Sequence, residues 1–138
     1  MTMSSAWIGS APRLLSMLRI VAAAVFVTAG TMKLFAFPVG APPDGATVPL
    51  LSQMGIGALL EIAGGGLVLL GFLTRPTAFI LSGEMAVAYF QFHAPQGFWP
   101  IANGGTAALL YCFLFLYLSA AGAGPWSVDA LRERRRAG

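Results

Sequence analysis

Four long apolar segments, separated by proline- and glycine-rich breaks, constrain the fold of this chain more than any other feature of its sequence. The segments cover about residues 14–37, 52–73, 76–93 and 103–122, and each falls near the roughly 17–25 residues that a membrane-crossing helix requires. The breaks read FPVGAPPDGATVP, TRP and APQGFWP, and such residue types end helices or open the next one. We therefore predict an all-α fold, a four-helix transmembrane bundle, in a single domain over residues 1–138.

The composition favours a bilayer over a soluble core. Hydrophobic residues make up 57% of the chain and charged residues 9%, whereas soluble domains are about 25% charged. A chain of 138 residues is too short to bury so much apolar surface within itself. The lipid bilayer is therefore the expected partner of this surface.

The placement of the basic residues predicts the orientation of the bundle. Half of the eight Lys and Arg residues lie in the tail, residues 123–138, as Arg132, Arg134, Arg135 and Arg136. Four crossings return both termini to one side, so the positive-inside rule predicts a multi-pass protein of the bacterial inner membrane with cytoplasmic termini. Because no folded basic surface lies behind the tail, we expect a cytoplasmic flank and no nucleic-acid binding. Residues 1–37 also have the layout of a signal peptide, but their long apolar part lacks a small-residue cleavage site.

Four ionisable side chains lie within or at the ends of the apolar segments: Arg19, Lys33, Glu61 and Glu84. A charge at the centre of a spanning helix costs about 2.5–3.5 kcal/mol, so we expect these groups to be paired inside the bundle. Helical spacing puts Arg19 and Lys33 on one face, about 21 Å apart along the axis. Matching depths then predict the pairs Lys33–Glu61 and Arg19–Glu84. Such pairs could form a functional site or only fix which helices pack together.

Small residues and one histidine surround this predicted network. Gly57, Gly64 and Gly65 share the helix face of Glu61, and small residues let another helix approach closely. His93, the single histidine, is expected at the outer mouth, either as a solvated imidazole or as a proton entry point or quinone-headgroup ligand. The single cysteine, Cys112, cannot form a disulfide within one chain, and no metal site is predicted.

The sequence resembles the DoxX family of small four-helix bacterial membrane proteins over nearly its whole length. The first two helices carry the resemblance in LRIVAAAVFVTAGTMKLF and LLEIAGGGLVLLGFLTRP, which contain Arg19, Lys33 and Glu61. The remaining matches are EMAVAYFQFHAPQGFWP, NGGTAALLYC and GAGPWSVDAL. The chain departs from the family at Thr106, since relatives commonly carry a glutamate after NGG.

The resemblance implies the fold more firmly than an activity. The family takes its name from relatives of a membrane subunit of a thiosulfate:quinone oxidoreductase. It therefore implies a redox-linked membrane subunit that engages a quinone or another lipophilic small molecule, with no covalently bound cofactor. In this reading Glu61 and Glu84 handle protons, while Arg19 and Lys33 hold their charge. Electrons would come from a soluble redox partner on the cytoplasmic side.

Two alternatives remain open at the level of the sequence, as does the question whether the chain is an enzyme. One is a non-catalytic scaffold that docks a soluble enzyme through the basic tail. The other is a small transporter, which would need a homo-oligomer because four helices form only a thin pathway.

Overall fold

The computed structural model of the protein describes residues 3–138, and all its regular elements in that range are helices. The predicted all-α class is thus confirmed. The chain divides into two compact units. The first contains the chain up to Thr74 together with Ala123–Gly138, and the second is Arg75–Gly122.

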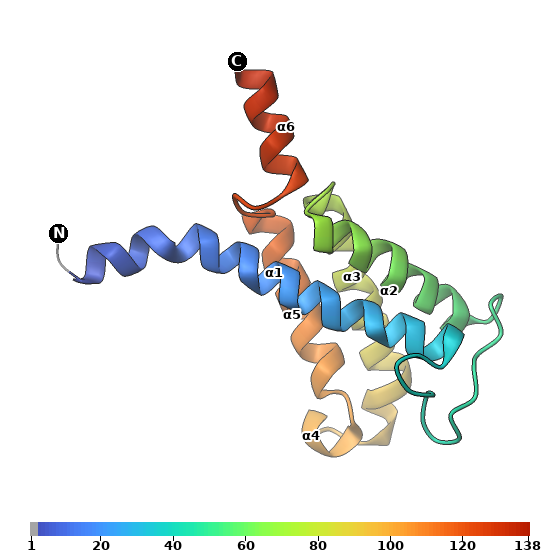
Figure 1. Ribbon diagram of the computed structural model, residues 1–138. Coiled ribbons are helices and arrows are strands. Elements are labelled where there is room, and N and C mark those ends of the chain that lie inside the picture. Colours follow the sequence, from blue (N-terminus) through green and yellow to red (C-terminus); the bar gives the residue numbers. More distant parts are fainter. Residues whose placement is uncertain (1–2) are drawn as a thin grey trace. The chain divides into compact units, whose positions relative to one another are not determined.

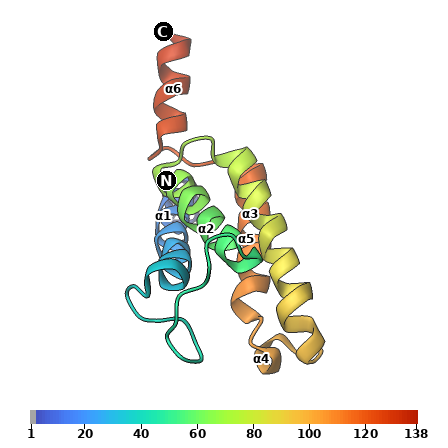
Figure 2. The same cartoon turned by 90° about the vertical axis from the view of Figure 1, so that its right-hand side faces the viewer.

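The first unit is built from α1 (Met3–Phe35), α2 (Gln53–Leu70) and α6 (Val128–Ala137). Helices α1 and α2 lie side by side and run in opposite directions, joined by the long loop over residues 36–52 (Figure 1). Helix α6 starts beside the carboxyl end of α2 and runs crosswise to α1, as both views show (Figures 1 and 2).

The ends of α2 follow from two residues. Ser52 is its N-cap, and the Ser52 hydroxyl accepts a hydrogen bond from the Gly55 N–H at 3.0 Å. Gly71 ends the helix with φ at 68°, a left-handed conformation that glycine adopts without steric cost. Helix α1 is longer than predicted, since it begins at Met3 and continues through Pro12.

Glycines allow α1 and α2 to pack backbone against backbone. A Cβ atom at Gly30 would lie 2.6 Å from the Ala58 carbonyl oxygen, and one at Gly65 would lie 2.8 Å from Val27 Cγ2. Gly64 and Gly65 are buried and Gly57 is half-buried. Gly65 thus lies close to α1, while the packing roles of Gly57 and Gly64 stay predictions.

The second unit contains α3 (Thr74–Ala88), the π-helical turn η1 (Tyr89–His93), η2 (Ala94–Gln96), α4 (Pro100–Asn103) and α5 (Thr106–Ala121). Helices α3 and α5 lie side by side (Figure 2), where the Ser82 hydroxyl donates to the Cys112 carbonyl at 2.8 Å. The Arg75 guanidinium donates to the carbonyls of Ser119 and Ala120 in the last turn of α5. A cation at this end complements the helix dipole.

The predicted apolar segments all form helices, but not as four uniform rods. Within residues 3–138, two helical stretches are long and apolar enough to cross a membrane, namely Ser5–Phe35 and Gln53–Leu70. The third segment changes from α-helix to π-helix at Tyr89, and the fourth is interrupted by Gly104 with φ at 71°. The four crossings therefore stay a prediction. The tail, for which the sequence analysis predicts no helix, forms α6 with Ser127 as N-cap.

Candidate functional site

Arg19 lies at the buried junction of α1, the end of α2 and the chain segment that follows α5. Its side chain has no exposed surface. Nε donates to the Ala123 carbonyl at 2.8 Å and Nη2 to the Trp126 carbonyl at 2.6 Å. Nη1 donates to the carbonyls of Val68 and Leu69 at 2.6 and 2.5 Å.

These four contacts explain how a cation persists there. Val68 and Leu69 belong to the last turn of α2, where the backbone carbonyls carry partial negative charge. The Val68 carbonyl also accepts the N–H of the capping residue Gly71 at 3.0 Å. The planar guanidinium presents donors in several directions, so it can serve carbonyls from two chain segments at once. Arg19 thus ties α2 to the segment that leads into α6.

Asp129 and Ser127 complete this junction. The two Asp129 carboxylate oxygens accept hydrogen bonds from the backbone N–H groups of Leu73 and Thr74, each at 3.0 Å. Although burial raises the pKa of Asp129, the Thr74 and Leu73 donors outweigh it and hold this pKa below its ordinary value. The Ser127 hydroxyl caps α6 by accepting from the Ala130 N–H at 3.1 Å. The sequence analysis assigned no role to either residue.

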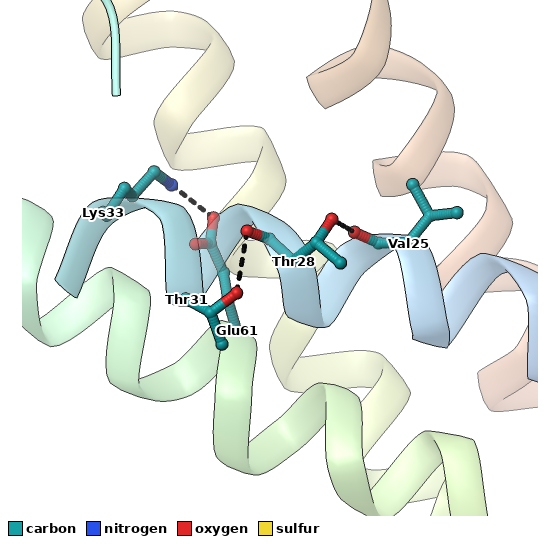
Figure 3. A network of polar contacts seen from close by, with 5 residues as sticks. All are labelled: Val25, Thr28, Thr31, Lys33 and Glu61. Carbon is teal, nitrogen blue, oxygen red and sulfur yellow. Dashed lines mark hydrogen bonds and ion pairs between the residues drawn. The ribbon is translucent and has the colours of Figure 1, made fainter. Parts of the chain in front are cut away.

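Lys33 and Glu61 form the ion pair that their matching depths predict. Lys33 Nζ lies 2.6 Å from Glu61 Oε1 (Figure 3). Lys33 comes from the last turn of α1, and Glu61 from the middle of α2. The hydroxyls of Thr28 and Thr31, which also appear in Figure 3, donate to backbone carbonyls and not to this pair: Thr28 to Val25, and Thr31 to Thr28 and Phe37.

The two members of this pair differ in their surroundings. The Glu61 side chain is 3% exposed and the Lys33 side chain 22%. The second carboxylate oxygen, Glu61 Oε2, is buried and has no hydrogen-bond partner among the described residues. A buried polar atom without a partner is rare in proteins, and Glu61 therefore has a buried oxygen that can accept a further donor.

His93 belongs to a separate polar cluster, in the second unit. Its Nδ1 lies 3.1 Å from the Asn103 carbonyl oxygen. The Asn103 side chain donates to the Gly97 carbonyl at 2.8 Å and accepts from the Gly105 N–H at 2.8 Å. The π-helical turn that carries His93 places it there, and such turns are frequent at functional sites.

An open apolar cavity of about 330 Å³ adjoins this cluster through Tyr89. Its size lies at the lower end of the range for small-molecule sites, and its largely apolar, aromatic lining is typical of them. The lining residues are Tyr89, Phe90, Ala94, Gly97, Phe98, Trp99 and Pro100.

Glu84 lies half-buried on α3, in the second unit. The predicted pairing of Glu84 with Arg19 stays a prediction, because the described Arg19 contacts are all to backbone carbonyls of the first unit. Within residues 3–138, no group of three or more His, Cys, Asp or Glu side chains is placed to hold a metal ion.

Comparison with known proteins places this chain among membrane proteins. The family model described as DoxX matches residues 14–94. An uncharacterised protein of Haemophilus influenzae is 47% identical over 123 residues, which cover 86% of this chain and 90% of that protein. Inner membrane protein YqjF of Escherichia coli is 31% identical over 129 residues, which cover 85% and 90%. No solved structure gives a significant match.

Proposed function

We propose that this chain, which belongs to the DoxX family of membrane proteins, is a redox-linked membrane subunit that binds a quinone or another lipophilic small molecule. The name of the Escherichia coli relative supports the bacterial inner membrane as its location. The length and apolar character of α1 and α2 support their crossing of the bilayer. Four crossings with both termini in the cytoplasm are part of the same proposal, based on the distribution of Lys and Arg.

The observation that carries the proposal is the unpartnered Glu61 Oε2 beside Lys33. A pair that served only to join α1 and α2 would be most stable with both carboxylate oxygens satisfied, because an unpartnered buried polar atom costs about 1–3 kcal/mol. A site that must receive a hydroxyl group from a ligand keeps such an acceptor open. The partly exposed Lys33 lies on the accessible side of the pair.

The pair has the chemical groups that quinone binding needs. A quinone headgroup presents carbonyl oxygens when oxidised and hydroxyl groups when reduced, so it needs a donor and an acceptor in turn. Lys33 supplies N–H donors, and Glu61 Oε2 supplies an acceptor that can also take a proton. We assign proton transfer to Glu61, with Glu84 in the same role and His93 at the outer entrance. The electrons are assigned to a soluble redox partner.

Ligand retention by Glu61→Gln tests the proposal. The protein is extracted with its own lipids and analysed by native mass spectrometry and by chromatography of the extracted quinones. We expect wild-type protein to retain a quinone or another discrete small molecule, and Glu61→Gln to lose at least roughly tenfold, which corresponds to about 1.4 kcal/mol. Glu84→Gln is expected to lose the ligand as well, without unfolding of the bundle.

Glu133→Gln is the matched control, because it makes the same acid-to-amide change on the exposed helix α6. This control should retain the ligand in full. Full retention by Glu61→Gln would remove Glu61 from the site and leave the ion pair with a packing role. Wild-type protein that retains bulk lipid alone would contradict the proposed ligand binding.

A further inference from the structure

Helix α6 is fixed to the first unit and is not a loose tail. Asp129 accepts hydrogen bonds from the Leu73 and Thr74 amides, and its own N–H donates to the Gly71 carbonyl at 2.9 Å. One turn later, the Arg132 guanidinium carbon lies 5.2 Å from the centre of the Phe72 ring. The start of α6 is therefore held against the carboxyl end of α2, and its direction is set by these contacts.

The free end of α6 carries the net charge of the whole chain. Residues 131–138 contain four arginines and one glutamate, a net charge of +3, and the chain as a whole also has +3. All eight of these residues are exposed. Because Arg132 lies over Phe72, the side chains left to meet an anionic partner are Arg134, Arg135 and Arg136.

The surroundings of α6 favour a lipid surface as the partner. The helix runs crosswise to α1 (Figures 1 and 2), and α1 is long and apolar enough to cross a bilayer. A helix crosswise to a spanning helix lies along the bilayer surface. Two apolar side chains near the start of α6, Trp126 just before the helix and Leu131 in its first turns, are 52% and 54% exposed, and exposed tryptophans are typical of the headgroup region.

We propose that α6 is a surface helix whose arginines bind the phosphate groups of anionic lipids, in the leaflet at the carboxyl end of α2. The guanidinium groups match phosphate oxygens in charge and geometry. Trp126 and Leu131 rest among the headgroups beside them. A basic residue at such a surface contributes about fivefold to lipid affinity, equivalent to about 1 kcal/mol. This interaction is independent of the proposed quinone site.

Native mass spectrometry of the full-length protein tests this proposal. Detergent-purified protein is mixed with equal amounts of phosphatidylglycerol and phosphatidylcholine, and the lipids that stay bound are counted. We expect wild-type protein to retain phosphatidylglycerol over phosphatidylcholine by at least roughly tenfold, given about fivefold per arginine. The combined variant Arg134→Gln, Arg135→Gln and Arg136→Gln should reduce this preference to near unity.

Three matched variants test whether the lipid preference comes from the charge of α6 or from another basic site. Arg13→Gln, at an exposed position of α1, should keep the preference. Glu133→Gln should increase it by about fivefold, because it removes the negative charge that lies among the arginines of residues 131–138. Replacing Arg134, Arg135 and Arg136 with lysine should largely preserve it, since the attraction depends mainly on charge.

Two results would overturn the proposal. One is equal retention of the two lipids by wild-type protein. The other is an undiminished preference in the triple glutamine variant. A third result, loss of a co-purifying acidic protein from that variant without any lipid preference in the wild type, would identify α6 as a protein-docking surface and would equally contradict lipid binding.

Discussion

Arg19→Ala is expected to be among the most destabilising single substitutions in this protein. The substitution removes a fully buried guanidinium that donates to four backbone carbonyls, at distances from 2.5 to 2.8 Å. Those carbonyls come from the end of α2 and from the segment that leads into α6. The loss would therefore take a donor from each of these buried carbonyls and remove one of the connections between α6 and α2.

The magnitude follows from the number and kind of bonds. A hydrogen bond to a charged group contributes about 1.5–3 kcal/mol, so four bonds give about 6 kcal/mol at the lower limit. Water can reach some freed carbonyls, because the junction lies at a helix end, and bonds that share one cation do not add independently. We therefore expect a loss of about 3–5 kcal/mol in the free energy of unfolding, as for the removal of one partner from a buried charged contact.

Thermal unfolding in a fixed detergent or lipid mixture measures this effect. For a chain of this size the expected loss lowers Tm by roughly 10–20 °C. Arg13→Ala, six residues earlier on the same helix and exposed, is the control and should change the stability by less than about 0.5 kcal/mol. Arg19→Lys should fall between the two, because an ammonium group cannot reach four carbonyls in one plane. Equal Tm values for Arg19→Ala and Arg13→Ala would refute the reasoning.

Three further changes test the packing, the ion pair and the capping carboxylate of the first unit. Gly30→Ala would place a methyl group 2.6 Å from a carbonyl oxygen of α2, so the stability should fall by about 1–3 kcal/mol in the same assay; unchanged stability would contradict the close approach. Lys33→Met combined with Glu61→Met replaces the ion pair with apolar side chains, so Tm should change little while bound quinone is lost; retained quinone would assign the pair a packing role. Asp129→Asn removes a carboxyl group whose native pKa lies below the ordinary 3.8. Burial raises this pKa, but the hydrogen bond from Thr74 lowers it, and the net effect is a lower value. A lowered native pKa adds stability above the unfolded-state pKa, which is lost as pH falls through the native pKa; the Tm gap to wild type should therefore close below about pH 4, and a gap independent of pH would exclude this contribution.

The helices could be predicted from the sequence more reliably than their ends. Long apolar runs and the breaks between them are local properties, and the ends of α2 at Ser52 and Gly71 follow from capping preferences. The π-helical turn at Tyr89 has no comparable local signal. It lies close to a residue distant in the sequence, since a Cβ atom at Gly105 would be 2.7 Å from Tyr89 Cε2 and 2.8 Å from His93 Cβ. Helix α6 did have a signal, since a serine N-cap precedes an aspartate in the first turn.

Pairing charged side chains by their depth in the bilayer predicts only part of the buried polar network. Lys33 and Glu61 could be paired from their depth alone, because each finds a charged side chain on the neighbouring helix. The described partners of Arg19 are backbone carbonyls, two at the end of α2 and two after α5. A comparison of charged side chains cannot find such partners, because every residue has a carbonyl and the fold alone decides which ones converge.

Arg19 and Lys33 therefore differ in their capacity to bind a ligand, although helical spacing puts them on one face of α1. Arg19 has a carbonyl acceptor for each of its three nitrogen atoms and no exposed surface, so a ligand could bind it only by displacing backbone contacts that hold α2 and α6 together. Lys33 is partly exposed and is paired with a carboxylate that has one oxygen open. Ligand exchange at Lys33 and Glu61 would break no backbone contact. For this reason we place the ligand of the first unit at the Lys33 end of α1 and assign the Arg19 end to the anchoring of α6.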